Sequence, residues 1–444
     1  MPRTWAISGV DLHLDLDGTR VRGALERTLR DAVRGGRLAP GTRLPSSRSL
    51  ARDLGLARNT VAAAYSQLVA EGWLEGRQGA GTRVALRPAA EEPAPSAPPP
   101  PRAPRFDLRP GLPDLGAFPR EAWLAAARRA LREAPLDAFG YGDPRGRIEL
   151  RRALAEYLAR ARGVAASPDR IVVCTGLVQG LSLVRAVVDG PWAAEEYGHA
   201  AHRRGLDPLP VAVDGDGAVV AELGDARAVL LTPAHQFPLG STLSPARRRQ
   251  AVEWARATDG IVVEDDYDGE FRYDRRPVGA MQALAPEHVV YAGTASKSLA
   301  PALRLGWLVL PPRLLDRVVA ARAHGDWPST LDQLTLAELI GSGGYDGQIR
   351  RARLAYRRRR DRLVAELGAV TGIDAGLHAV VELKEDEREV VDRAGRNDLL
   401  LEGLDQYRFG DRPRGPALVV GYGTPPEHAW EGALGRLREV LRPT

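Results

Sequence analysis

The sequence predicts an α/β protein in which a small, mostly helical N-terminal unit precedes a large unit built on an open sheet. In the first ninety residues, apolar side chains recur at helical spacing between glycine turns. Further along, short apolar runs each end in a polar cluster, which is typical of buried strands in sheets that bind ligands at their C-terminal edge. A chain of 444 residues is long enough for two or three domains.

Three helices and a two-stranded wing are predicted in the N-terminal unit. A first amphipathic helix covers residues 21–33, and a second, shorter helix begins near Pro45 and ends at Leu54. Gly55 then makes a tight turn into a third helix over residues 57–70, as in helix-turn-helix proteins. This third helix is expected to pack on Val61, Ala64, Tyr65 and Leu68. Residues 73–84 follow as the wing, with a glycine-rich tip.

The N-terminal unit has the charge of a DNA-binding domain. Residues 18–87 contain thirteen arginines and five acidic residues, an excess of +8, which favours binding to a phosphate backbone. The third helix opens with Arg58, Asn59 and Thr60, whose polar side chains can reach base edges and phosphates. We therefore expect it to be the recognition helix. The alternative is a three-helix domain that binds another protein.

A proline-rich segment separates the two units. Residues 88–104 contain runs of proline and alanine, and such segments tend to polyproline II at roughly 3.1 Å per residue, or on the order of 50 Å in all. We predict a DNA-binding domain at 18–86, a linker at 87–105 and a large domain at 106–444.

Lys297 is the candidate reactive residue of the large domain. It is one of only two lysines among sixty-two basic residues, and an amine can form a Schiff base whereas a guanidinium cannot. The hydroxyls of Thr294 and Ser296 and the cation of Arg304 would suit a phosphate beside an aldehyde carbon. This combination points to pyridoxal 5'-phosphate. The alternative is a surface lysine in a polar loop.

Other strand ends offer the remaining groups that this cofactor needs. Backbone N–H groups of Gly176, Leu177 and Val178, at the start of a helix, could bind a phosphate. Asp265 is suited to keep the ring nitrogen protonated, and Tyr267 could bond to the ring hydroxyl. The alternatives for the acids at 264–266 are an acidic loop or a divalent-metal site. His235 is a further candidate only because it follows a predicted strand.

The N-terminal motifs resemble a GntR-type winged helix. The resemblance rests on Leu44-Pro-Ser-Ser-Arg-Ser-Leu-Ala51, on Leu54-Gly-Leu-Ala-Arg-Asn-Thr-Val61 and on the Gly-Ala-Gly-Thr wing. It implies contacts to double-stranded operator DNA from Arg48, Arg58, Asn59, Thr60, Arg77 and Gly79.

Residues 139–422 resemble the fold-type-I aminotransferases, and the fusion of the two domains looks like the MocR subfamily of GntR regulators. The matching runs are Tyr141-Gly-Asp-Pro-Arg-Gly146, Thr232-Pro-Ala-His-Gln-Phe-Pro238, Glu264-Asp-Asp-Tyr267 and the Lys297 segment. The resemblance implies that Lys297 bonds to the cofactor aldehyde, with Asp265 at the ring nitrogen, Tyr267 at the ring oxygen, and Ser296 and Arg304 at the phosphate. It also implies that Tyr141 reaches the cofactor of a partner subunit, and hence a homodimer.

The sequence departs from the family pattern in three places. No Pro-Gly precedes Tyr197, the candidate for the tyrosine that stacks on the cofactor ring. Leu177 and Val178 lack the usual hydroxyl and amide side chains. Val419 stands where aminotransferases carry the arginine that binds the substrate carboxylate.

Composition and the remaining polar residues argue against several classes of protein and of binding site. No apolar run approaches the eighteen residues of a membrane span and the N-terminus lacks a signal peptide, so we expect a cytoplasmic protein that binds no membrane. The single cysteine, Cys174, lies in an apolar run and is expected to be a small buried side chain. We expect no metal site, with His199, His202 and His378 facing solvent or bonded locally. The arginine run at 350–360 is expected to be a solvated helix face, with a DNA or subunit contact as the alternative.

Three functions fit these observations. The favoured one is a transcriptional regulator that binds pyridoxal phosphate and senses the cofactor or a small amine. The second is a working class I/II aminotransferase that carries a DNA-binding appendage. In the third, the large domain is only a cofactor reservoir or dimer scaffold.

Overall fold

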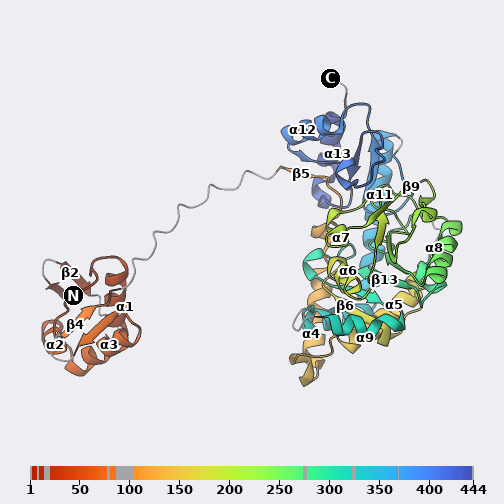
Figure 1. Cartoon of the computed structure of the whole chain (residues 1–444). Helices are drawn as coiled ribbons and strands as arrows, with labels where there is room; N and C mark the ends of the chain where they lie inside the picture. Colours follow the sequence, from red (N-terminus) through yellow and green to blue (C-terminus); the bar gives the residue numbers. More distant parts are fainter. Residues whose placement is uncertain are drawn as a thin grey trace. The chain divides into compact units, whose positions relative to one another are not determined.

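The computed structural model describes residues 3–7, 10–14, 21–77, 81–86, 104–273, 278–322, 327–368 and 370–442. They belong to two compact units, residues 1–101 and 102–444, each of which is described by itself (Figure 1). The proposed linker at 87–105 lies almost wholly outside the described residues. The exact domain limits at 18–86 and 106–444 therefore stay predictions.

The N-terminal unit contains the three predicted helices and the wing. The helices are α1 (Val21–Arg34), α2 (Ser47–Leu54) and α3 (Arg58–Ala70), and the wing pairs β3 (Leu74–Arg77) with β4 (Gly81–Val84) in antiparallel order. Gly55 ends α2 in the left-handed region, at φ 63°, which only a residue without a β-carbon adopts easily. An antiparallel hairpin that the sequence did not lead us to expect, β1 (Arg3–Ile7) with β2 (Val10–Leu14), precedes α1.

The packing face of α3 is the expected one. Its four buried residues are Val61, Ala64, Tyr65 and Leu68, and they join residues of α1, α2 and the wing in one hydrophobic cluster. Because this face is used for packing, the first turn of α3 is left exposed at Arg58 and Asn59.

A seven-stranded sheet forms the centre of the large unit. Its strand order is β6 (Ile171–Cys174), β14 (Gly306–Val309), β13 (Val289–Thr294), β12 (Ile261–Asp265), β11 (Ala228–Leu231), β7 (Trp192–Glu195) and β8 (Leu209–Val211). Only β14 runs antiparallel to its neighbours. Cys174 is buried at the end of β6, as expected for a small apolar side chain.

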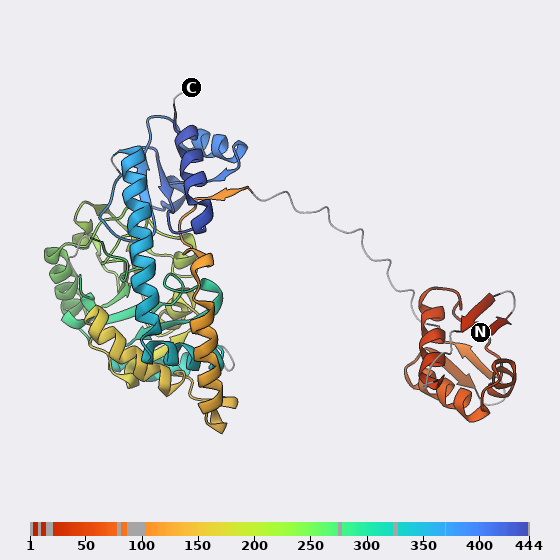
Figure 2. The same ribbon diagram turned by 180° about the vertical axis from the view of Figure 1, so that it is seen from behind.

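Helices cover both faces of this sheet. They are α4 (Arg120–Glu133), α5 (Ile148–Arg162), α6 (Leu177–Arg185), α7 (Ala200–Arg203), α8 (Pro245–Thr258), α9 (Pro312–Ala321), α10 (Thr330–Gly341) and α11 (Gly344–Leu367). Successive side chains of β12 point to opposite faces of the sheet, so Val263 packs with α6 and α9 whereas Val262 packs with α8. Figure 2 shows α11 running along the large unit, with α4 beside its lower part.

A smaller C-terminal part packs at one end of α11. It contains a three-stranded sheet of β15 (Ala379–Glu382), β18 (Ala417–Val420) and β17 (Glu402–Gly403), with helices α12 (Glu387–Arg396) and α13 (Trp430–Val440). The short strand β5 (Phe106–Asp107) pairs with β16 (Leu399–Leu400), so the start of the large unit is tied to its C-terminal part.

The arginine run on α11 is not wholly a solvated face. Arg359 is only 2% exposed, and its guanidinium bonds to Asp114 at 2.8 Å, to Glu427 at 2.7 Å and to the carbonyl oxygen of Pro425 at 2.8 Å. The expectation failed here because the C-terminal part and the segment before α4 close over this side of the helix.

Replacing Arg359 by alanine should destabilise the large unit by about 3–5 kcal/mol, since the change leaves the Asp114 carboxylate buried without its cation. Arg358→Ala is the matched control, because Arg358 is exposed on the same helix and its loss should change stability by about 0.5 kcal/mol or less. The midpoint of urea unfolding, followed by circular dichroism, measures the difference. Equal midpoints for the two variants would refute a structural role for this ion pair.

Candidate cofactor site and DNA-binding surface

A cavity of about 560 Å³ opens at the C-terminal edge of the sheet. It is lined by the turns that follow β6, β7, β12 and β13 and by residues of the C-terminal part. Ten of the twelve residues predicted to bind the cofactor line it: Lys297, Asp265, Tyr267, Ser296, Thr294, Arg304, Gly176, Leu177, Val178 and Tyr197. His235 and Tyr141 do not line it.

Lys297 lies just beyond β13, and its amine is turned into the cavity. The Nζ atom donates a hydrogen bond to the carbonyl oxygen of Gly111 at 2.5 Å. Burial lowers the pKa of this amine, while the carboxylates of Asp265 and Asp268 oppose that shift. A lysine with a lowered pKa is more often neutral, and the neutral amine is the form that attacks an aldehyde.

The three acids at the end of β12 have separate partners. Glu264 accepts hydrogen bonds from the backbone N–H groups of Met281 and Gln282, at 2.7 and 2.8 Å. Asp266 pairs with Arg162 through two hydrogen bonds of 2.6 and 2.9 Å. These two carboxylates are engaged with partners of their own, so the structure does not bring the three acids together as ligands of one metal ion.

Asp265 is the acid left for the cavity. Within the described part of the chain its side chain accepts no hydrogen bond, and its one ion pair, Oδ2 to His202 Nδ1, is 4.0 Å long. Burial raises the pKa of Asp265 well above its usual range, Asp266 adds to the rise, and Lys297 opposes it. A buried carboxylate in this state lacks a cationic donor, which the protonated ring nitrogen of pyridoxal phosphate would supply.

Hydroxyl groups and one exposed cation form the side of the cavity next to β6 and β14. The hydroxyls of Thr294 and Ser296 lie 2.8 Å apart. Arg304 is exposed, holds a left-handed backbone at φ 51°, and has no ion-pair partner among the described residues. Helix α6 begins at Leu177 without a side-chain cap, so its first N–H groups remain open. These donors fit a phosphate, and together with Asp265 they make the site suitable for pyridoxal phosphate.

Tyr197 lines the cavity, and its expected stacking role stays a prediction. Its ring is 1% exposed and packs in a hydrophobic cluster with Val419 and Tyr407, and its hydroxyl donates to the carbonyl oxygen of Arg412 at 3.3 Å. His199, two residues further on, also lines the cavity. His199 Nδ1 accepts a hydrogen bond from the N–H of Ala201 at 3.1 Å, which fixes the ring at the start of α7.

Two more histidines border the cavity, which the sequence did not lead us to expect. His202 lines the wall beside Asp265, and its ring centroid is 5.4 Å from that of His199. His378 is 4% exposed, and its Nε2 lies 3.1 Å from the carbonyl oxygen of Pro238. His199 is exposed and bonded locally, as expected, and it also lines the cavity. The residues next to His202 and His378 in the sequence do not mark a binding site, because the cavity is assembled from segments that are far apart in the chain.

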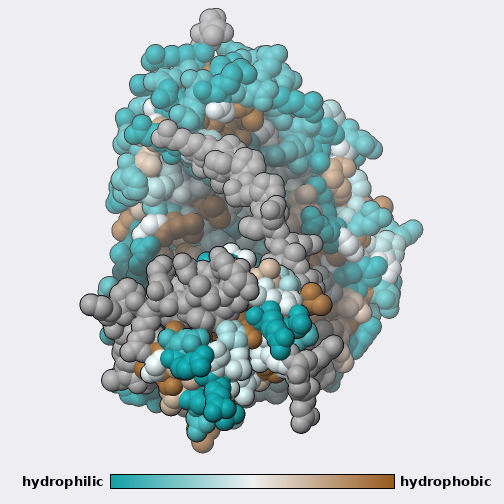
Figure 3. All heavy atoms as spheres, turned by 90° about the vertical axis from the view of Figure 1, so that its left-hand side faces the viewer, coloured by the Kyte–Doolittle hydropathy of each residue, from teal (hydrophilic) through white to brown (hydrophobic). Residues whose placement is uncertain are grey.

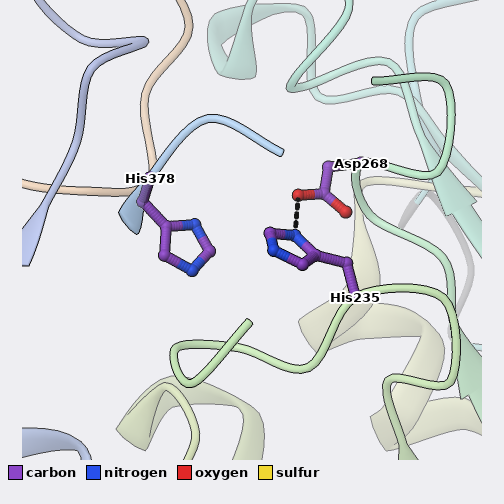
Figure 4. Close-up of side chains that lie close together, drawn as sticks. All are labelled: His235, Asp268 and His378. Carbon is purple, nitrogen blue, oxygen red and sulfur yellow. Dashed lines mark hydrogen bonds and ion pairs between the residues drawn. The ribbon is translucent and has the colours of Figure 1, made fainter. Parts of the chain in front are cut away.

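His235 lies behind the cavity in a buried polar cluster with Asp268 and His378 (Figure 4). His235 Nδ1 is 2.8 Å from Asp268 Oδ2 and 3.3 Å from the hydroxyl of Tyr267. The ligand atoms of the three residues all lie within 4.8 Å of one another, a spacing that a metal ion would accept. Two of the three groups already bond to each other, so we assign the cluster to holding Tyr267 in place. The absence of a metal site stays a prediction.

Three of the six residues predicted to bind DNA have exposed side chains. Arg48 on α2 and Arg58 and Asn59 on α3 are exposed, and Thr60 is half-buried. Arg77 is the last residue of β3, whereas Gly79 lies outside the described residues. Arg58 begins α3 and has no ion-pair partner within the described part of the chain, so it is free for a base or a phosphate.

Arg58→Ala should weaken specific DNA binding by about 1–3 kcal/mol if the side chain reads a base. If it contacts a phosphate, the loss should be similar on every DNA sequence, and the slope of log K against log salt should fall by about 0.9. Arg27→Ala removes an equally exposed charge from α1 and serves as the control. Fluorescence anisotropy over a salt series checks this. Unchanged affinity for all DNA would refute the role of Arg58.

Comparison with known proteins assigns both units. The model of bacterial regulatory proteins of the gntR family matches residues 22–84, and that of aminotransferase class I and II matches residues 110–389. The chain belongs to the MocR subfamily of GntR regulators. It is 32% identical to the pyridoxine biosynthesis transcriptional regulator PdxR of Corynebacterium glutamicum, over 95% of this chain and 96% of the relative. It is 34% identical to the probable rhizopine catabolism regulatory protein MocR of Rhizobium meliloti, over 97% and 95% of the two chains.

Solved structures show the fold of the large unit. A crystal structure of a Pyrococcus horikoshii kynurenine aminotransferase superposes with a TM-score of 0.69 at 25% identity, covering 77% of this chain and 91% of the other. The predicted fold, a winged helix joined to a fold-type-I domain, is thus confirmed. This MocR-type protein is a DNA-binding transcriptional regulator, which favours the first of the three functions over a working aminotransferase. No helix among its described residues is long and apolar enough to cross a membrane.

Proposed function

We propose that this regulator binds pyridoxal 5'-phosphate in the cavity and couples a small amine effector to DNA binding. The observation that carries the proposal is that half-buried Lys297 and buried Asp265 share one cavity, in a chain that also presents exposed Arg58 and Asn59 on the predicted recognition helix. When bound, the cofactor supplies an aldehyde that reacts with amines and a ring that withdraws electrons.

Each side chain has a separate task in this proposal. Lys297 holds the aldehyde carbon, and Asp265 keeps a proton on the ring nitrogen by charge pairing. Tyr267, oriented by His235, donates to the ring oxygen. Arg304 and Ser296 bind the phosphate with the N–H groups that open α6. His199 and Tyr197 both line the cavity, and His199 would cover one face of the ring.

The C-terminal part offers no replacement for the missing carboxylate-binding arginine. Arg408 bonds to Asp405 at 2.7 Å, and Arg412 bonds to Glu222 at 3.1 Å. Arg414 bonds to a backbone carbonyl and lies 5.8 Å from the ring centroid of Tyr197. None of the three lines the cavity, which supports the cofactor itself or an amine without a carboxylate as the signal.

We also propose a homodimer that works in the cytoplasm. Tyr141 is 88% exposed and lies away from the cavity of its own chain, which suits a side chain that reaches a partner's cavity. Leu131, Leu136 and Phe139 on the same segment are 54%, 92% and 60% exposed, and a partner would cover them. Hydrophobic residues also reach the surface in patches on the face seen in Figure 3.

DNase footprinting upstream of the protein's own coding region tests the proposal. The full-length protein is compared without cofactor, with pyridoxal phosphate, and with pyridoxal phosphate plus a panel of amines. We expect a protected site whose occupancy changes with the cofactor and changes again with one class of amine. A footprint that none of these additions alters would leave only the scaffold function.

A further inference from the structure

The cavity is lined in part by Glu402, whose carboxylate has no role in the proposed cofactor binding or in DNA binding. Glu402 begins β17, and the chain after it is tied to the end of β7, because Gly198 N–H donates to the carbonyl oxygen of Tyr407 at 2.9 Å. In the sheet β7 is three strands away from β13, which precedes Lys297, or about 14 Å at the usual strand spacing. Glu402 lines the cavity together with Gly198 and Tyr407, the two residues that make this tie.

The carboxylate of Glu402 is held in place. It is half-buried, and the hydroxyl of Tyr407, whose side chain is buried, donates a hydrogen bond to its Oε2. In the pairing of β17 with β18, Glu402 stands directly opposite Val419. A negative charge thus borders the position at which an aminotransferase would carry a positive one.

No neighbouring cation neutralises this charge within the described part of the chain, where Glu402 makes no ion pair. The charge of Glu402 helps to raise the pKa of Arg109, but the guanidinium of Arg109 is bonded to Asp107 at 2.7 and 3.0 Å. Arg203 also lines the cavity and keeps its positive charge, but its guanidinium lies 4.3 Å from the ring centroid of Phe409, its Nη1 is bonded to backbone carbonyl oxygens, and among the described residues it makes no ion pair with Glu402.

The charges of Glu402 and Lys297 both act on His199, which lines the same cavity. Burial lowers the pKa of His199, Lys297 adds to that effect, and Glu402 opposes it, so both charges act on one imidazole in the cavity wall. Lys297, His199 and Glu402 line the same cavity, so a ligand attached at Lys297 can present its free end to Glu402.

We propose that Glu402 binds a second, positively charged group of the effector, so that the effector is a diamine or another amine with a cationic far end. The inference rests on the proposed function, in which the cavity holds an amine beside pyridoxal phosphate. An ammonium group at the far end gains a charge-assisted hydrogen bond to Glu402, whereas a carboxylate there meets a like charge. Tyr407 is the positioning residue that orients the carboxylate.

Isothermal titration of the full-length protein loaded with pyridoxal phosphate tests this with three ligands of one chain length. They are 1,4-diaminobutane, butylamine and 4-aminobutanoate. The diamine should bind about 10- to 100-fold more tightly than butylamine, the factor expected for one hydrogen bond to a charged group, and the amino acid should bind most weakly. The affinities of diamines with three and five carbons then show which chain length binds most tightly.

Variants separate Glu402 from its surroundings. Glu402→Gln should remove the preference for the diamine while leaving butylamine affinity within about twofold, and Tyr407→Phe should reduce the preference part of the way. Asp405→Asn removes an exposed acid three residues away that does not line the cavity, and should leave all three affinities unchanged.

The outcomes distinguish this inference from the proposed function. Failure of the protein to take up pyridoxal phosphate, read from its absorbance, would overturn both. Loaded protein that binds diamine and butylamine alike, prefers the amino acid, binds no diamine, or responds equally to Glu402→Gln and Asp405→Asn would overturn this inference alone.

Discussion

Lys297→Ala protein should lose the near-visible absorbance that full-length wild-type protein shows with pyridoxal phosphate. The reason is chemical, because a covalent link to the aldehyde needs a primary amine in the cavity, and Lys297 supplies it among the residues that line the site. Its lowered pKa favours the neutral, reactive form. We expect the loss to be essentially complete, with any remaining cofactor removed by dialysis.

Lys384→Ala is the matched control, because Lys384 is the only other lysine in the chain. Lys384 is exposed and does not line the cavity, so Lys384→Ala should keep the absorbance. Reduction with borohydride followed by peptide mass analysis should place the pyridoxyl group on Lys297 in both wild-type and Lys384→Ala protein. Absorbance retained by Lys297→Ala would overturn the assignment.

The parts of the site that the sequence predicted share a physical origin. Asp265, Tyr267, Thr294, Ser296 and Lys297 follow buried apolar strands, and parallel strands bring their carboxyl ends to one edge of a sheet. Local pattern was therefore enough to gather them. The same holds for α3, where helical spacing alone identified the buried face.

The parts that were missed depend on contacts between distant segments. Glu402 and His378 reach the cavity only because the C-terminal part folds back over the edge of the sheet, and no local pattern marks that return. Tyr197 was expected to stack on the cofactor ring, and His199 to face solvent or bond locally. Both line the cavity, but Tyr197 also packs in a hydrophobic cluster formed with the C-terminal part. Arg359 was taken for a surface residue because its partners, Asp114 and Glu427, are far away in sequence.

The second large effect that we expect is poor transamination of ordinary α-amino acids. An aminotransferase must hold the substrate carboxylate so that the amine faces the cofactor, and a bidentate arginine provides both orientation and charge pairing. Here Val419 is fully buried in a hydrophobic cluster, and Glu402 stands opposite it with a charge that repels a carboxylate. Hydrogen bonds to charged groups contribute roughly 1.5–3 kcal/mol each, so the loss of two should lower kcat/KM by about 10²- to 10⁴-fold.

Steady-state assays of the loaded protein against a panel of amino and keto acids measure this effect. We expect an absorbance change on adding an amine that binds, together with altered DNA affinity, and turnover far below the rate of about 1 per second or more that is ordinary for enzymes. Glu402→Gln removes the repulsion, so this variant should recover part of the amino acid affinity. Sustained turnover by the wild-type protein at ordinary enzyme rates would instead show that the large domain is a working aminotransferase, and that the pairing of Val419 with Glu402 does not prevent carboxylate binding.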